Sequence, residues 1–258
     1  MAEAEWKTAI TDIGPGRIAV RGYSITDIME RLSYAEAVYL ILKGELPGQA
    51  EAALMNAILV SSIDHGASPP SVLGARTVMS GGNSLNAAVA GGVLVIGDSH
   101  GGAIEQSARI MQEWAGELDD SAGNVVDVAG RLVDRLKKTG KRMPGFGHRL
   151  HKVDPRTAQL FGVAERHGYS GRHIALCKAL EKVLAEKLGK QLPINVDGAI
   201  AAVISDMGFD WRLGKGFFII SRVPGLVAHA YEEMTREKPM RKLGPTPYEY
   251  DGPPDRAL

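Results

Sequence analysis

Amphipathic helical segments separated by glycine- and proline-rich loops constrain the fold of this chain more than any other feature. Apolar residues recur at intervals of three and four in the stretches 26–44, 50–63, 84–98, 101–116, 125–140 and 171–190. This spacing is typical of helices that bury one face. No segment alternates apolar and polar residues between hairpin turns, and "VLVIG" (93–97) is only an isolated strand candidate. The pattern therefore predicts an all-α protein.

The composition excludes several classes of protein. Lys+Arg and Asp+Glu are equal at 30 each, which argues against a general nucleic-acid binder or a protein bound to a membrane surface. A single cysteine, Cys177, excludes an internal disulfide framework and a cysteine-based zinc site. The N-terminus carries no signal-peptide pattern, and no apolar run reaches the ~18 residues that a membrane span needs. We therefore expect a cytoplasmic protein that binds neither nucleic acid nor membrane.

Polar clusters stand where the apolar helices end, in residues 64–71, 97–105, 143–156 and 193–200. Their distinctive groups are His65, His100, His148 and Asp197. Taken singly, each has a structural interpretation, such as a helix N-cap for Asp197 or a cation at a helix end for His65. Taken together, histidines and an aspartate at helix ends beside glycines predict an acid/base site on a helical scaffold.

Two arginines accompany this predicted site. In "MPGFGHRLHKVDPR" (143–156), Asp154 is predicted as the N-cap and Pro155 as the first residue of a helix, which fixes Arg156 near His148. Arg222 lies in a largely apolar helix, and a buried guanidinium requires an anionic partner. Arg156 and Arg222 are therefore predicted to clamp a dicarboxylate.

The motifs together resemble those of the citrate synthase superfamily over nearly the whole chain. The resemblance lies in "RGYSITDIMERLSYAEAVYLILKGELP", "DHG", "HGGAIE", "GFGHRLHKVDPR", "NVDG" and "SRVPGLVAHAYEEM", which stand in the family's order. It implies a large helical domain from residues 1–114 and 223–258 and a smaller helical domain from residues 115–222. The site would lie in the cleft between them, and a homodimer or higher homo-oligomer would complete it.

The resemblance also implies a role for each matched residue. The implied catalytic residues are His100, His148 and Asp197, which would act on an acyl-CoA thioester and an oxo acid. The residues implied to bind the dicarboxylate are His65, Arg156, Arg222 and, across the dimer, Arg241. The residues implied to bind coenzyme A are Gly145, Phe146, Gly147, Arg149 and Lys152. Neither a permanently bound cofactor nor a metal is expected, because coenzyme A is part of the substrate.

Departures from the synthase pattern leave the reaction open. The chain is short and carries "DHG" and "NVDG", which resemble citryl-CoA lyase and the C-terminal module of ATP-citrate lyase. This reading predicts cleavage of citryl-CoA, or of a close 3-hydroxy-3-carboxyacyl-CoA, to acetyl-CoA and oxaloacetate. His100 equally suits a citrate or 2-methylcitrate synthase. A non-catalytic regulator that binds coenzyme A or a dicarboxylate is a third alternative, and a separate CoA-ligating partner protein stays open.

Overall fold

The computed structural model describes residues 6–120, 125–147, 154–241, 251–252, 254 and 256. Most of these residues are helical, so the predicted fold class is confirmed. The helices are α1 (Ile25–Arg31), α2 (Tyr34–Lys43), α3 (Gln49–Ser61), α4 (Pro70–Ser80), α5 (Leu85–Leu94), α6 (Ala103–Ala115), α7 (Glu117–Asp120), α8 (Val125–Lys138), α9 (Pro155–Arg166), α10 (Arg172–Leu188), α11 (Val196–Asp206), the short 3-10 helix η1 (Trp211–Leu213) and α12 (Gly214–Arg236).

The sequence pattern does not predict the small antiparallel sheet near the N-terminus. Its strands β1 (Thr11–Gly14), β2 (Arg17–Val20) and β3 (Tyr23–Ser24) pair in the order β1-β2-β3. Such short strands are too brief to display an alternating pattern. The isolated candidate "VLVIG" is not a strand, because its first residues belong to the last turn of α5.

A capping box divides the first long helical stretch into two helices. The hydroxyl of Ser33 accepts a hydrogen bond from the backbone N–H of Glu36, and the Glu36 carboxylate accepts one from the backbone N–H of Ser33 at 2.8 Å. These bonds satisfy donors at the start of α2 and therefore begin a new helix there. At the other end of α2, Gly44 adopts φ 92° and ends the helix as predicted.

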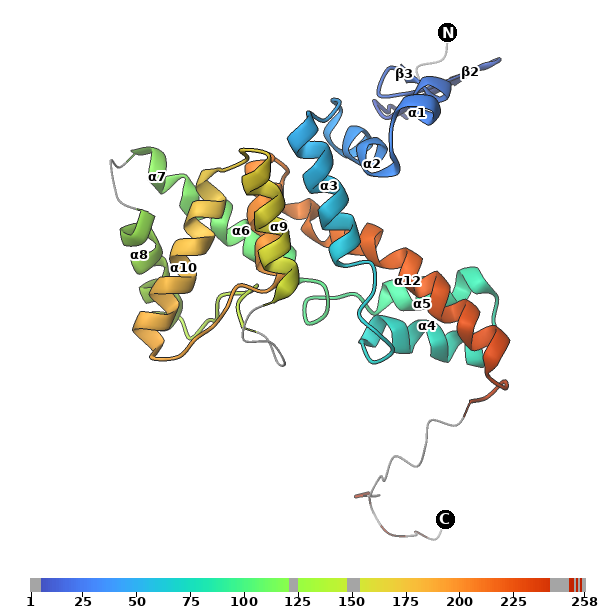
Figure 1. The fold of residues 1–258 in the computed structure, drawn as a ribbon. Coiled ribbons are helices and arrows are strands. Elements are labelled where there is room, and N and C mark those ends of the chain that lie inside the picture. Colours follow the sequence, from blue (N-terminus) through green and yellow to red (C-terminus); the bar gives the residue numbers. More distant parts are fainter. Residues whose placement is uncertain are drawn as a thin grey trace.

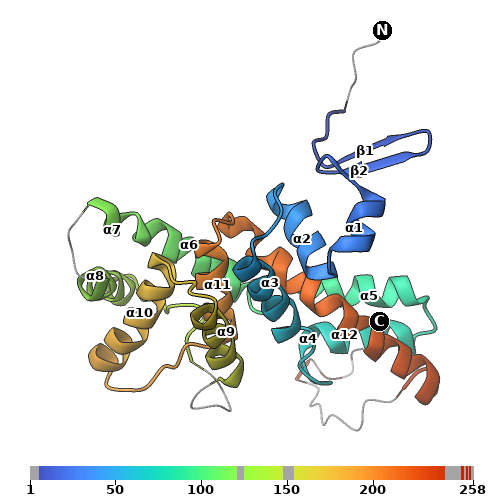
Figure 2. The same cartoon turned by 45° about the horizontal axis from the view of Figure 1, so that its top comes forward.

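The helices form two groups joined by the long helix α12 (Figure 1). Helices α6 to α11 gather on one side, while α4, α5 and the second half of α12 lie on the other. Helix α11 is the centre of the main core, where residues 198–205 are all buried. A smaller apolar cluster of Val72, Ala75 and Leu226 joins α4 to α12. The turned view in Figure 2 shows the same two groups, with the N-terminal hairpin projecting away from both.

The first residues after α12 are hydrogen-bonded to α4 of the same subunit. The backbone N–H of Met240 donates to the carbonyl oxygen of Ser80 at 2.8 Å, and that of Arg241 donates to the Ser80 hydroxyl at 2.7 Å. These bonds attach the first residues after α12 to the end of α4. The predicted non-helical arm from residue 237 agrees with the structure as far as residue 241.

Candidate functional site

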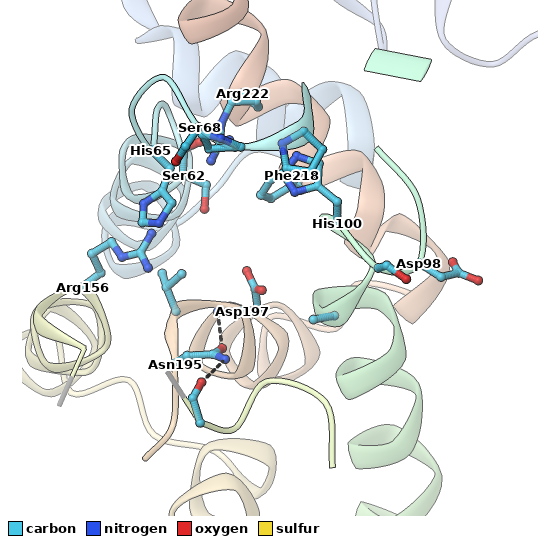
Figure 3. Close-up of a pocket in the computed structure, with 17 residues that line it drawn as sticks. Ser62, His65, Ser68, Asp98, His100, Arg156, Asn195, Asp197, Phe218 and Arg222 are labelled. Atoms are coloured by element: carbon cyan, nitrogen blue, oxygen red, sulfur yellow. Dashed lines mark hydrogen bonds between the residues drawn. The ribbon is translucent and has the colours of Figure 1, made fainter. Parts of the chain in front are cut away.

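A cavity of about 630 Å³ opens between the two helix groups. Its walls come from the α3–α4 loop, the α5–α6 loop, the start of α9, the start of α11 and the first half of α12. Figure 3 shows His65, Arg156 and Asp197 around this space on side chains from different elements, while the carboxylate of Asp98 points away from it. The structure brings together these residues of the predicted site: His65, His100, Gly147, Arg156, Asp197 and Arg222.

Asp197 lies in the first turn of α11, but it is not the residue that caps this helix. The N-cap is Asn195, whose side-chain oxygen accepts the backbone N–H groups of Asp197 at 3.0 Å and Gly198 at 3.2 Å. The Asp197 carboxylate is therefore left to face the cavity. Its removal from bulk solvent raises its pKa, and the nearby cations Arg156 and Arg222 oppose only part of this effect.

His100 is held by Ser71, in the first turn of α4. The backbone N–H of Ser71 donates to Nε2 of His100 at 3.3 Å, and the Ser71 hydroxyl lies 2.8 Å from the same nitrogen. Because a backbone N–H can only donate, Nε2 is the acceptor and the proton of the neutral ring is on Nδ1. Burial, Arg222 and His65 all lower the pKa of His100, which favours this neutral form.

Arg156 is fixed by the buried residue Asp154. Its Nε and Nη2 donate to the two Asp154 carboxylate oxygens at 3.0 and 2.9 Å. The same carboxylate accepts the backbone N–H groups of Arg156 and Val196, each at 3.0 Å. Burial alone would raise the pKa of Asp154, but these hydrogen bonds outweigh it and hold the pKa below its usual value. Asp154 is thus the predicted N-cap, and it also ties Arg156 to the residue before Asp197.

Arg222 is buried beneath the opposite wall of the cavity, with 3% of its surface exposed. Its Nε donates to the backbone carbonyl of Ser62 at 2.9 Å, and its guanidinium carbon lies 4.8 Å from the centre of the Phe218 ring. Among the described residues, its Nη1 has no hydrogen-bond partner. Within the described part of the chain, no carboxylate is hydrogen-bonded to Arg222. The anionic partner predicted from the sequence is therefore not one of these side chains.

The loop that carries His65 is anchored to α12. The carboxylate of Asp64 accepts the backbone N–H of Gly66 at 2.9 Å and lies 3.0 Å from Nε2 of His229. Gly225 of α12 packs against the same loop so closely that an added methyl group would meet the carbonyl oxygen of Ile63. These contacts hold the loop in position, so His65 projects into the cavity.

A second cavity of about 390 Å³ lies beside the first, and Gly147 lines both. Its floor is apolar, with Leu184, Leu188 and Phe146 among its residues. Its cationic residues are Lys137, Lys141, Arg142 and Lys190. An apolar floor with cations at its edge suits a ligand that combines an aromatic ring with phosphates.

The remaining predicted residues are placed as follows. His148, Arg149 and Lys152 lie outside the described residues. Gly145 packs against Gly198 instead of lining either cavity. Arg241 lies outside the cavity of its own chain, and its Nε is 2.9 Å from the carboxylate of the buried residue Glu233.

Sequence reasoning missed the side chains that position the others. Ser71 holds His100, Asn195 caps α11, and Ser62 lines the cavity beneath Arg222. Serine and asparagine are common at helix ends for local reasons, so the sequence offered no signal that separated these positions from ordinary caps. Within the described ranges, no group of three metal-ligating side chains is found, and no helix is long and apolar enough to cross a membrane.

Comparison with known proteins identifies similarity to the citrate synthase family. The family model described as "Citrate synthase, C-terminal domain" matches residues 48–243. A curated relative, "Probable ATP-citrate synthase" of Dictyostelium discoideum, is 28% identical over 248 residues, which cover 88% of this chain. The chain spans only 38% of that relative's length, and less than two thirds of the length of the citrate synthases that it matches next.

Several solved structures resemble the whole chain, and two of them are citrate-related lyases. Citryl-CoA lyase from Hydrogenobacter thermophilus is 48% identical with a TM-score of 0.91, and the match covers 99% of this chain and 98% of the other. ATP citrate lyase from Methanothrix soehngenii, in complex with citrate and coenzyme A, has a TM-score of 0.86 at 23% identity. The second match covers 99% of this chain and 43% of the other, and at this identity it supports the fold alone.

Proposed function

The chain belongs to the citrate synthase family, and on that premise we propose that it cleaves citryl-CoA to acetyl-CoA and oxaloacetate. The observation that carries the proposal is the presence of Asp197, His100 and two arginines around one cavity. An acid, an electrophilic hydrogen-bond donor and two carboxylate-binding cations are the groups that this cleavage requires. The similarity to citryl-CoA lyase along the full length supports this direction of reaction.

The cleavage is a retro-Claisen reaction. A base takes the proton of the tertiary hydroxyl, the carbon–carbon bond to the thioester methylene breaks, and the hydroxyl oxygen becomes the carbonyl of oxaloacetate. The electron pair of the broken bond passes to the thioester as an enolate, which takes up one proton at carbon to give acetyl-CoA. In this proposal the resemblance assigns the first step to His148, which lies outside the described residues.

Asp197 is proposed to deliver the proton to carbon. This role requires the carboxylic acid at the start of the step, and burial raises the pKa of Asp197 in that direction. In condensation the same group would start as the carboxylate and remove the proton. A raised pKa therefore suits Asp197 to deliver the proton in cleavage, and it equally strengthens the carboxylate as the base in condensation.

His100 is proposed to stabilise the enolate through Nδ1–H. Its Nε2 accepts from Ser71, so the donor nitrogen is the one left for the thioester oxygen. A neutral donor is better matched to an enolate than a strongly acidic imidazolium, because it stabilises the charge without losing its proton. His65, Arg156 and Arg222 are proposed to bind the carboxylates of the oxaloacetate part.

The second cavity is proposed to receive the adenosine end of coenzyme A. Phe146 and Gly147 line it, as the resemblance implies for the "GFG" loop. Lys141, Arg142 and Lys190 are suited to contact phosphates there, and the resemblance assigns the same role to Arg149 and Lys152. Because Gly147 lines both cavities, the pantetheine arm would pass this glycine to reach Asp197.

A homodimer is proposed to form through α4, α5 and α12. Exposed apolar side chains on these helices include Leu73, Leu94, Tyr231 and Met234, and Leu94 is 85% exposed. Contiguous exposed apolar surface is typical of protein–protein interfaces, and these side chains would be covered in the proposed dimer. A role of Arg241 in the partner's site stays a prediction, and its ion pair with Glu233 would have to open. The division into domains 1–114 with 223–258 and 115–222, which would close over the cavity, is part of the same proposal.

Direct assay of the purified protein tests the proposal. Incubation with citryl-CoA is expected to release oxaloacetate, measured by coupling to malate dehydrogenase. Absence of oxaloacetate release from citryl-CoA in this assay would refute cleavage of this substrate. Such an enzyme needs a supply of citryl-CoA, so a separate CoA-ligating protein in the cytoplasm belongs to the proposal.

The second candidate is condensation of an acyl-CoA with a 2-oxo acid, and His100 is the residue that favours it. Free thiol that appears from acetyl-CoA only when a 2-oxo acid is added would support this direction. A regulator that only binds these ligands would need the arginines but not a buried acid at position 197. Binding of coenzyme A without turnover of any thioester would favour that third alternative.

A further inference from the structure

Two buried polar atoms, in residues that line the first cavity, lack a hydrogen-bond partner among the described residues. They are the hydroxyl oxygen of Ser62 and Nη1 of Arg222, in residues that are 1% and 3% exposed. Buried polar groups are almost always satisfied, because an unmade hydrogen bond costs the full desolvation of the group. Two such atoms on one cavity wall indicate a ligand that supplies the missing acceptors.

The two atoms belong to one connected unit. The backbone carbonyl of Ser62 accepts Nε of Arg222 at 2.9 Å, and this bond fixes the end of α3 to α12. Figure 3 places Ser62 on the same side of the cavity as His65 and Arg222, facing the helix that carries Asp197. Serine can donate one hydrogen bond and arginine can only donate, so their shared ligand must be an acceptor.

We propose that the Ser62 hydroxyl and Nη1 of Arg222 together bind one carboxylate of the substrate. This inference rests on the proposed function, since it takes the dicarboxylate product as the ligand. A carboxylate offers two acceptor oxygens and a charge that matches the guanidinium. Ser62 is thereby a substrate-binding residue that the family resemblance did not assign in this chain.

The test compares Ser62→Ala with the control variant Ser61→Ala. The hydroxyl of Ser61 donates to the carbonyl of Ile58 at 2.8 Å, so its bond stays within α3. Oxaloacetate binding is measured by titration calorimetry, and kcat and KM are measured with citryl-CoA. A hydrogen bond to a charged group predicts about tenfold or more weaker oxaloacetate binding for Ser62→Ala. KM should rise by a similar factor with little change in kcat, because the bond is present before and during cleavage.

Thermal unfolding separates a binding role from a structural one. Because the Ser62 hydroxyl has no partner within the described residues, its removal is expected to leave the Tm of the ligand-free protein unchanged or raised. The increase in Tm caused by oxaloacetate should shrink. A lowered ligand-free Tm would overturn the inference, because the hydroxyl would then have a structural partner.

Equal oxaloacetate affinity in wild type and Ser62→Ala would also overturn it, and would assign the hydroxyl to a water molecule. Failure of the proposed function is distinguishable. If wild type binds oxaloacetate and Ser62→Ala binds it weakly, the subsite stands even where citryl-CoA is not cleaved. If wild type binds no dicarboxylate, the subsite is refuted together with the lyase.

Discussion

Replacement of Asp197 by asparagine should raise stability and abolish turnover in the same molecule. Asparagine keeps the size of the side chain and cannot deliver the proton to carbon. Acid–base groups contribute about 10²- to 10⁴-fold to rate, so kcat for citryl-CoA should fall by that factor. Binding of oxaloacetate should be retained, because Arg156 and Arg222 line the cavity independently of this carboxylate.

The stability effect follows from the raised pKa of Asp197. Burial raises this pKa above that of the unfolded chain, so the folded state binds the proton more tightly. Stability therefore falls as pH rises from the unfolded pKa through the folded pKa, and the loss is complete above it. Each pKa difference of one corresponds to about 1.4 kcal/mol. The substituted asparagine does not titrate, so Asp197→Asn should have the higher Tm at neutral pH, with the gap closing in acid.

The assay is thermal unfolding from about pH 4 to pH 8, together with the coupled oxaloacetate assay. Asp127→Asn is the matched control, because Asp127 also lies in the first turn of a helix but is exposed on α8. It should leave kcat unchanged, because Asp127 lines neither cavity. The reasoning is refuted if Asp197→Asn keeps kcat within tenfold of wild type, or if its Tm at neutral pH falls below that of wild type.

Three further substitutions probe the groups around Asp197. Ser71→Ala should lower kcat by up to about tenfold with little change in KM, because His100 loses the hydroxyl that lies 2.8 Å from Nε2, while the backbone N–H of residue 71 still donates to this nitrogen; an unchanged kcat would show that the hydroxyl does not support His100. Arg222→Lys should raise KM for citryl-CoA at least tenfold, since an ammonium cannot reproduce the planar guanidinium, and steady-state kinetics measures it. Lys190→Ala should raise KM for the thioester at low salt and much less at high salt, as expected for a partly exposed phosphate contact; a salt-independent change would contradict this.

Most helix positions were predictable because they depend on local patterns, but α4 was not among the predicted helical stretches. The capped start of α9 at Asp154 and the glycine stop of α2 at Gly44 were read directly from the sequence. The break at Ser33 was missed, although Ser33 and Glu36 form a recognisable capping box, because the apolar spacing continues across it. The N-terminal sheet was missed because its strands are shorter than the pattern that identifies a strand.

The polar clusters at helix ends suggested a shared site, but the role of each of His65, His100, Arg156, Asp197 and Arg222 in it came from the family resemblance. Local spacing places four of them at or near a helix end and Arg222 within a helix, and it does not say which of these positions meet. The hydrogen bonds that hold these side chains in place are harder to predict, because Ser71 and His100 are 29 residues apart and Arg222 and Ser62 are 160 residues apart. Such partners are set by helix packing, and many other serines in the sequence offer the same hydroxyl group.

The structure gives a physical reason for Gly198, the residue after Asp197, which is one of the departures from the synthase pattern. A methyl group on Gly198 would collide with the carbonyl oxygen of Gly145, and one on Gly145 would lie 2.5 Å from the α-carbon of Gly198. Gly145 also has φ +81°, a conformation that favours glycine, and its carbonyl accepts the backbone N–H of Asn195 at 3.0 Å. The "GFG" loop therefore rests directly on the first turn of α11. A side chain at position 198 would push this loop away from the turn that carries Asp197. The glycine of "NVDG" is therefore required for the loop to pack where the two cavities meet.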